Sequence, residues 1–285
     1  MKLAAITDEI SQDFERALDV LVEHGAAGAE LRGLWGVNIG DLSTEQTNRA
    51  RLALHQRGLK VCALASPFFK CDLDFGGESG IRGPLHLARP RGLNEQLDLL
   101  QRCCDLAHLF ECRFIRVFAF WRKSDLTDEL LGRIVQAFQE PLQIAARHGI
   151  TLLLENEHSC NFGTGVEVAK AAKAINSPHL KVVWDPGNAF AAGERPYPDG
   201  YEAARPYIAH IHIKDGIRSP DGKVKWCVVG EGKIDYEGQF AALKADGYDG
   251  YISLESHYRM PDGSSEPASR ACLTALQRFI GAENT

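Results

Sequence analysis

The sequence predicts an α/β protein that folds as one (β/α)8 barrel, and two observations support this fold class. Eight apolar runs of strand length recur along the 285 residues, and a helical stretch follows each run. Alternation of strands and helices favours parallel strands joined by crossover helices. Eight such units in one chain fit a closed barrel, which typically takes roughly 250 residues. Because no composition break or Pro/Gly/Ser-rich linker is present, we expect one domain over residues 1–285.

The strand candidates are short apolar runs bounded by polar or turn-forming residues. In chain order they are residues 3–7, 28–31, 59–65, 114–120, 150–155, 180–185, 208–215 and 250–255. The intervening helices are amphipathic. The segment 11–25 has Ser11 as its expected N-cap and Gly25 as its expected stop, and the segment 43–58 repeats this design with Ser43 or Thr44 near the cap and Gly58 at the end.

Two long connections follow strand candidates. Residues 66–90 follow the third strand and contain little regular pattern, and residues 216–234 follow the seventh. Barrel enzymes keep their active sites at this end of the strands, so both loops are placed to act as lids. No phosphate-cradling glycine loop is evident, because the GGESG sequence at 76–80 follows no clear strand.

Composition narrows the function class. The formal net charge is −6 and the pI is about 5.9, which disfavours a nucleic-acid partner. No apolar run approaches the roughly 20 residues that span a bilayer. The eight cysteines form no CxxC pair and several lie in apolar runs, as expected for free buried thiols. We therefore expect a soluble cytoplasmic protein without a membrane partner.

Four consecutive strand candidates end in a charged or coordinating residue. These residues are Glu155, Asp185 and Glu255, with His212 at the matching depth of the seventh strand. Alternate residues of a barrel strand point inward, so the four side chains can converge above the core. Buried carboxylates need a compensating cation. One such carboxylate alone would be an ordinary helix cap, but four in succession predict a metal site, and its oxygen-rich donors suit Mn²⁺, Mg²⁺ or Co²⁺ better than structural zinc.

The seventh strand carries the sequence HIHIKD at 210–215. Because side chains alternate between the two faces of a strand, His210, His212 and Lys214 share one face. A solvated face and an inward-facing site both fit this pattern taken alone.

The ordered segments LLLENE, VVWDPGN, HIHIKD, GEGKID and GYDGYISLESH resemble the xylose-isomerase-like TIM barrel superfamily, and more narrowly its sugar phosphate isomerase/epimerase branch. The resemblance is strongest over about residues 150–257. It implies that Glu155, Asp185, His212 and Glu255 bind one divalent metal ion, with Mn²⁺ favoured and Mg²⁺, Co²⁺ or Zn²⁺ as alternatives. It also implies that Lys214 sits at the rim, whereas His210 lies one layer deeper as a hydrogen-bonded residue.

The resemblance implies proton transfer at a carbon next to a carbonyl. In ketose 3-epimerases of the family, two glutamates remove and return the proton of an enediolate, and these correspond to Glu155 and Glu255. The sixth strand departs from that pattern, because Asn188 replaces a histidine. A metal-dependent dehydratase or lyase of the inosose dehydratase type therefore remains open, with His257 or Lys214 as the acid that assists loss of a hydroxyl.

Further substrate contacts are expected from residues that follow the strands. They are Arg32, Lys70, Glu157, His158, Asn188, Lys214, Arg218 and His257. Each has a plainer explanation: Lys70 would by default be a surface lysine, and Arg32 is equally well explained by a structural ion pair with Glu30 on the same strand face.

Two other function classes compete. An AP endonuclease like endonuclease IV shares the barrel, but it needs extra histidines after the second and third strands, where this chain has LR and SP. A non-catalytic sugar-binding barrel would need no intact ligand set. We expect a small carbohydrate substrate, no nucleic acid, and a homodimer or homotetramer by resemblance. The sequence does not distinguish a free sugar from a sugar phosphate or a cyclitol.

Overall fold

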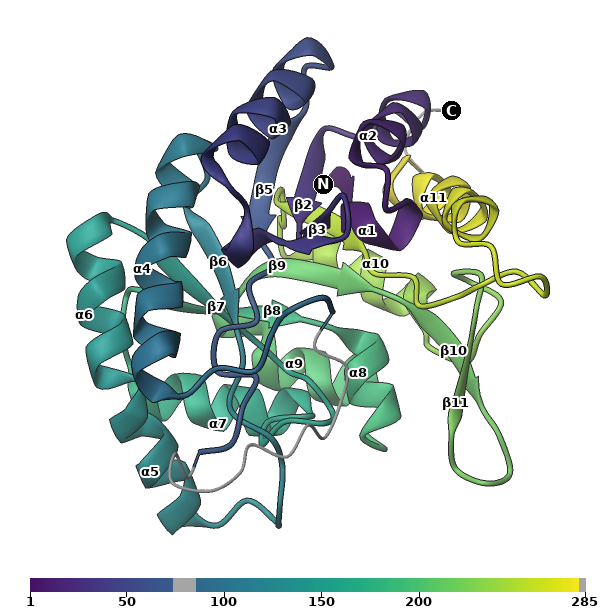
Figure 1. Cartoon of the computed structure of the whole chain (residues 1–285). Coiled ribbons are helices and arrows are strands. Elements are labelled where there is room, and N and C mark those ends of the chain that lie inside the picture. Colours follow the sequence, from purple (N-terminus) through teal and green to yellow (C-terminus); the bar gives the residue numbers. More distant parts are fainter. Residues whose placement is uncertain (74–85, 282–285) are drawn as a thin grey trace.

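The computed structural model describes residues 1–73 and 86–281, and within them the chain forms a (β/α)8 barrel (Figure 1). Its eight strands pair in parallel in the order β1-β12-β9-β8-β7-β6-β5-β2 within this described part. A parallel bridge between Ile6 and Glu30 links the two ends of that order, so the barrel closes. The strands are β1 (Lys2–Ala5), β2 (Gly28–Leu31), β5 (Lys60–Leu64), β6 (Phe114–Val117), β7 (Thr151–Glu155), β8 (Leu180–Trp184), β9 (Ile208–Ile213) and β12 (Tyr251–Leu254).

Each of the eight predicted strand segments overlaps a barrel strand, which confirms the fold class. Helices surround the barrel (Figure 1). They are α1 (Thr7–Ile10), α2 (Phe14–Glu23), α3 (Thr44–Gln56), α4 (Leu93–Leu109), α5 (Asp128–Ala137), α6 (Gln139–His148), α7 (Gly165–Ile175), α8 (Pro186–Ala191), α9 (Tyr201–Ala204), α10 (Tyr236–Ala245) and α11 (Glu266–Gly281). In this part of the chain no helix has the length and apolar character needed to cross a membrane.

The first helix boundary differs from the prediction. Asp13, not Ser11, is the N-cap of α2, and its carboxylate accepts a hydrogen bond from the backbone N–H of Arg16. Ser11 ends the short helix α1 instead, because its backbone is extended. The prediction for α3 is confirmed: Ser43 forms a capping box with Gln46 at its start.

The long connection predicted at 216–234 contains a β-hairpin, which the sequence analysis did not assign. Strand β10 (Asp215–Arg218) pairs in antiparallel fashion with β11 (Val224–Cys227), and Figure 1 shows the hairpin projecting from the barrel. The other long connection, 66–90, lies partly outside the described residues, as does the whole GGESG sequence at 76–80. Short strands β3 (Gly33–Leu34) and β4 (Val37–Asn38) form a second hairpin after β2.

The barrel interior combines a small apolar layer with a polar one. Ala63, Leu153 and Val183 pack together inside the barrel, apart from the large cluster between sheet and helices. Side chains of one strand alternate between faces. Glu155 and Asp185 follow Leu153 and Val183 by two residues, so they occupy the same inner face one layer nearer the carboxyl ends of the strands. The eight cysteines are all free, as predicted.

Candidate active site

Four residues from consecutive strands meet at the carboxyl end of the barrel. Glu155 ends β7, Asp185 follows β8, His212 lies in β9 and Glu255 follows β12. Each offers a ligand atom, and these atoms all lie within 4.8 Å of one another. All four side chains are buried. The structure therefore brings together the residues that strand periodicity predicts, while their roles stay predictions.

His212 lies at the centre of this group. Its Nδ1 is 3.1 Å from Glu155 Oε1 and 3.8 Å from Glu255 Oε2. Burial disfavours the charged imidazolium, but the nearby carboxylates of Glu30 and Glu155 outweigh burial and raise the pKa of His212 to about 10.

The sequence DPGN after β8 positions Asp185. One oxygen of Asp185 accepts a hydrogen bond from the backbone N–H of Asn188 and so caps α8, with Pro186 at the first helical position. Its other oxygen faces the site. Gly187 is required by close packing, because a Cβ there would lie 2.3 Å from Cγ of Lys214.

Glu30 is a central residue that the sequence analysis did not assign to the site. It is fully buried on β2 and accepts hydrogen bonds from both histidines of the HIHIKD strand, at 2.8 Å from His210 Nε2 and 2.9 Å from His212 Nε2. Burial opposes ionisation, but the two histidines lower its pKa well below the usual value. A carboxylate that holds the Nε2 side of an imidazole leaves Nδ1 oriented for a cation. The predicted hydrogen-bonded role of His210 is confirmed.

Lys214 does not sit at the rim, so that prediction is wrong. Its side chain is buried, and its Nζ lies 2.5 Å from Asp185 Oδ2 and 2.6 Å from Glu255 Oε2. Its shared face with His212 was predicted correctly; its depth was not, because depth depends on the stagger between strands. Burial lowers its pKa, but attraction by Asp185 and Glu255 is stronger and raises it.

The donor set fits a divalent metal ion. Three carboxylates and one imidazole are ligands that manganese, magnesium, cobalt and zinc accept. Glu155 Oε2 is buried without a hydrogen-bond partner among the described residues, as expected for an oxygen available to a cation. Lys214 contacts two of these carboxylates. An ion bound there would either share the carboxylates with the ammonium group of Lys214 or displace that group from them.

Arg32 forms a different ion pair from the one expected. Its guanidinium contacts Asp8 at 3.0 Å, Glu9 at 2.6 Å and Glu255 at 2.9 Å. The expected ion pair between Arg32 and Glu30 is wrong, because the carboxylate of Glu30 is hydrogen-bonded to the two histidines of β9. Arg32 instead lies one layer higher, where the acidic residues of α1 reach it, and it holds Glu255 from the side opposite Lys214.

Arg116 of β6 is a second residue that the sequence analysis missed. It is buried, and its Nη1 lies 3.4 Å from Glu155 Oε2 and 3.7 Å from Glu255 Oε1. Its Nε has no hydrogen-bond partner among the described residues. An arginine inside the otherwise apolar run FIRVFAF was the available signal, because an arginine is rarely buried without a partner.

A chain of polar contacts connects the predicted substrate residues to the carboxylates. Asn188 donates from Nδ2 to Glu155 at 3.3 Å and to Asp185 at 3.2 Å. Its Oδ1 lies 3.3 Å from His158 Nδ1, which is 3.2 Å from Glu157.

Lys70 extends this chain. Its Nζ lies 3.0 Å from Glu157 and 4.4 Å from the centre of the Phe118 ring. Lys70 is buried, so the expectation of a surface lysine is wrong.

Of the last two predicted substrate residues, His257 lies beside the four-residue cluster and Arg218 does not. The Nε2 atom of His257 is buried without a hydrogen-bond partner among the described residues and lies 3.7 Å from Glu255 Oε1. Its ring packs edge-on against Trp226 of the hairpin. Arg218 is exposed on β10 and donates to backbone carbonyl groups of Gly222 and Phe190, so the structure does not bring it to the four-residue cluster.

Sequence relatives include enzymes of two reaction types. The chain is 20% identical over 268 residues to an inosose dehydratase of Geobacillus thermodenitrificans, covering 84% of this chain and 83% of that protein. It is 25% identical over 240 residues to an L-ribulose-5-phosphate 3-epimerase, UlaE, of Salmonella paratyphi C, covering 77% and 78%. An uncharacterized protein of Methanocaldococcus jannaschii, MJ1311, is 29% identical over 137 residues, but the match spans only about half of each chain, 47% and 46%.

Solved structures share the fold over the whole length. The crystal structure of an IolI protein with a zinc atom superposes with a TM-score of 0.77 at 17% identity, covering 100% of both chains. The family model for xylose isomerase-like TIM barrels matches residues 18–277. This chain therefore belongs to the xylose isomerase-like TIM barrel family.

Proposed function

We propose that this protein is a divalent-metal-dependent isomerase or epimerase that acts on a keto-sugar or sugar phosphate through an enediolate. The observation that carries the proposal is the convergence of Glu155, Asp185, His212 and Glu255, with ligand atoms within 4.8 Å of one another. The UlaE relative supports the reaction type. A bound divalent ion would supply Lewis-acid polarisation of the substrate carbonyl.

Glu155 and Glu255 are the proposed acid/base pair. They come from β7 and β12, which are separated in the barrel by β8 and β9, so they approach a substrate from different directions. Each is buried. One carboxylate removes the proton from the carbon next to the carbonyl and the other returns a proton to the opposite face, which inverts that carbon.

The cationic side chains around the pair hold it in place. Arg32 and Lys214 contact different oxygens of Glu255, Oε1 and Oε2, and Asn188 donates to Glu155. The ammonium of Lys214 and the guanidinium of Arg116 are proposed to stabilise the negative charge that develops on the enediolate oxygen. The Lys70–Glu157 pair and His158 are proposed to bind substrate hydroxyl groups.

A dehydratase of the inosose type is the second candidate. Two observations favour it: the inosose dehydratase relative and the buried Nε2 of His257, which has no hydrogen-bond partner among the described residues. In this reaction the same base forms the enediolate or enolate, and His257 donates a proton to the departing hydroxyl group. The product then lacks one water, which distinguishes the two candidates.

The test follows hydrogen exchange at carbon in deuterated water, with a panel of keto-sugars, sugar phosphates and keto-cyclitols supplied with Mn²⁺. Mass spectrometry of the recovered substrate and product detects deuterium, epimerisation and loss of water together. We expect the wild type to incorporate deuterium, and Glu155→Gln to reduce exchange by about 10²–10⁴-fold, the usual contribution of a general base. Glu129→Gln, the same substitution at an exposed position of α5, is the matched control and should retain full exchange.

Metal content of the same samples, measured by elemental mass spectrometry, makes the result decisive. One ion per chain in the wild type and none in Asp185→Asn supports the metal site. If Glu155→Gln binds the ion and retains full turnover, its acid/base role is wrong. Full exchange by the wild type in the presence of a chelator would instead assign the charge stabilisation to Lys214 and overturn metal dependence.

A further inference from the structure

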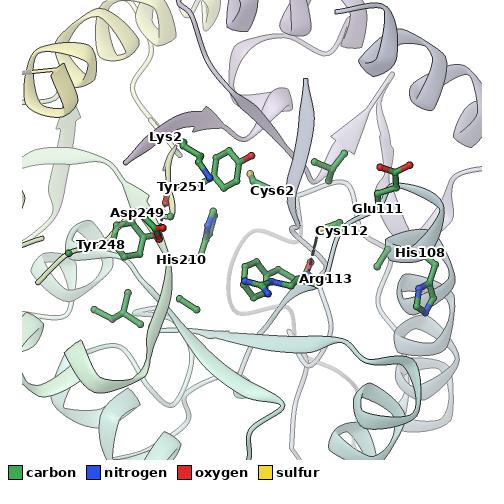
Figure 2. Close-up of a pocket in the computed structure, with 17 residues that line it drawn as sticks. Lys2, Cys62, His108, Glu111, Cys112, Arg113, His210, Tyr248, Asp249 and Tyr251 are labelled. Atoms are coloured by element: carbon green, nitrogen blue, oxygen red, sulfur yellow. Dashed lines mark hydrogen bonds between the residues drawn. The ribbon is translucent and has the colours of Figure 1, made fainter. Parts of the chain in front are cut away.

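A cavity opens at the end of the barrel opposite the candidate active site. It has a volume of about 740 Å³ and is lined by residues at the starts of barrel strands, among them Lys2 of β1, Phe114 of β6 and Tyr251 of β12. Figure 2 shows side chains that line the cavity, with Lys2, Tyr251, Cys62 and His210 among the labelled residues. Barrels of this type place their catalytic groups at the other end, so the proposed reaction does not use this cavity.

Three donor groups of different chemistry meet beside the cavity. Glu30, Cys62 and His210 each offer one ligand atom, and these atoms lie within 4.8 Å of one another. Cys62 and His210 line the cavity, whereas Glu30 lies behind them at 0% exposure. Cys62 is free rather than part of a disulfide. A carboxylate, a thiol and an imidazole are the groups that bind zinc in proteins.

We infer that Glu30, Cys62 and His210 form a second cation site, which takes a borderline or soft divalent ion such as Zn²⁺ or Cd²⁺. Three protein ligands leave a fourth tetrahedral position for a ligand that enters from the cavity. This site differs from the candidate active site in its ligand atoms, because it includes a sulfur donor. The candidate active site, called the upper site below, offers only oxygen and nitrogen from its four residues. The inference is independent of the proposed reaction.

Binding requires one proton to leave. The Cys62 thiol is buried, and burial together with the negative charge of Glu30 raises its pKa well above the usual value, so the metal-free group carries its proton. On binding, that proton passes to water in the cavity and a sulfur–metal bond forms. The ring nitrogen of His210 that binds the ion carries no hydrogen; if it is Nε2, the ion replaces its hydrogen bond to Glu30 and the N–H moves to Nδ1. Glu30 binds through one carboxylate oxygen.

Glu30 connects the two ends of the barrel. One of its oxygens faces His210, at 2.8 Å, and the other faces His212, at 2.9 Å. The plainer explanation of this cluster is a buried ion pair that only supports His212. That explanation needs neither a thiol within reach of the pair nor a cavity beside it, and it predicts no binding of a thiophilic ion.

The test is a Cd²⁺ titration of the full-length reduced protein, followed by the ultraviolet charge-transfer absorption of a thiolate–cadmium bond. We expect the band to grow to one equivalent per chain in the wild type. The upper site cannot produce it, because that site holds no sulfur, so Asp185→Asn should give the same band. Cys112→Ser removes another buried thiol that lines the same cavity and is the matched control, which should also retain the band. Cys62→Ser should lose it.

Several outcomes would overturn the site. They are no band in the wild type at excess Cd²⁺, a band that persists in Cys62→Ser, and a band that Cys112→Ser abolishes. Circular dichroism first checks that each variant is folded. If Cys62→Ser is unfolded, X-ray absorption of the wild-type cadmium complex decides instead: one sulfur with nitrogen and oxygen neighbours supports the site, and none or two or more sulfur atoms contradicts it.

Discussion

Charge balance in the candidate active site depends on single residues, and Lys214 gives the sharpest case. Its ammonium lies within 2.6 Å of both Asp185 and Glu255 in a fully buried cluster. Removing one partner of a buried ion pair destabilises a protein by about 3–5 kcal/mol, because the remaining charge is left uncompensated. We expect Lys214→Met to lower the free energy of unfolding by about this amount in chelator-treated protein. A saturating divalent cation should then recover part of the loss.

Urea denaturation in chelator and in Mn²⁺ measures both effects. Lys223→Met removes an exposed lysine and is the control, which should change stability little in either condition. Equal stability of Lys214→Met and the wild type in chelator would show that the buried carboxylates do not need this cation.

For single residues, the sequence predicted which side chains of the same strand lie on one face. It did not predict contacts between residues of different strands in detail. The alternation in HIHIKD indicated that His210, His212 and Lys214 share a face, and the structure agrees. It did not indicate that Glu30, more than 170 residues away, would bond to both histidines. Depth inside a barrel depends on the stagger between strands, which single-strand periodicity does not contain. The same limit explains why Lys214 was placed at the rim.

Among the elements, the loop from β10 to α10 is organised by one carboxylate. Asp215 accepts hydrogen bonds from the backbone N–H groups of Gly216, Gly230, Gly232 and Ile234. Gly232 has no room for a side chain, since a Cβ there would lie 1.9 Å from Asp215 Oδ1. The GEGKID segment therefore folds around Asp215, the last residue of HIHIKD. These hydrogen bonds keep β10 against the mouth of the barrel.

We expect Asp215→Ala to release this loop without unfolding the barrel. Each buried N–H group left unsatisfied costs about 1–3 kcal/mol, so local opening should become easier. Hydrogen exchange followed by mass spectrometry should show faster exchange over 228–234 and in β10, with unchanged rates in β7. Asp221→Ala, at the exposed turn of the hairpin, serves as control. Unchanged exchange in 228–234 would mean that other contacts hold the loop.

Strands and helices with a clear pattern of apolar residues were predicted well, whereas the β10–β11 hairpin was missed. The apolar barrel strands and the Ser43 cap carry local signals that tertiary structure did not override. The segment GIRSPDGKVKWC also carries one, because Asp-Gly between strand-like residues is a turn signal. Its strands are polar on their exposed parts, so the apolar criterion used for barrel strands does not find them.

Across the whole molecule, the seam where the barrel closes is held by charges as well as by the sheet. Between β1 and β2 the described ladder contains the single bridge of Ile6 and Glu30. Above it, Glu9 of α1 contacts Arg32 at 2.6 Å and Arg259 at 3.1 Å, and so joins the first units to the segment after β12. Burial opposes ionisation of Glu9, but attraction by Arg32 is stronger and lowers its pKa to about 2.

This shift predicts how the seam responds to acid. A carboxylate with a lowered pKa in the folded state stabilises it above the unfolded pKa, near 4.5, and loses that contribution as the pH falls towards 2. The free energy of unfolding of Glu9→Gln should therefore lie below the wild-type value at pH 6. The difference should shrink between pH 4.5 and pH 2. Denaturation over this pH range measures it, with Glu45→Gln on the exposed surface as control. A pH-independent difference would exclude this origin.

The position of Glu30 has a consequence for how this protein can change during evolution. One carboxylate satisfies His210 and His212 at once, so none of the three residues can be exchanged alone without leaving a buried polar group unpaired. Substitutions at positions 30, 210 and 212 should therefore occur together along a lineage or not at all. Exposed loop residues such as Lys223 and Asp221 make no such pair of buried hydrogen bonds, so we expect them to vary independently while positions 30, 210 and 212 stay constant.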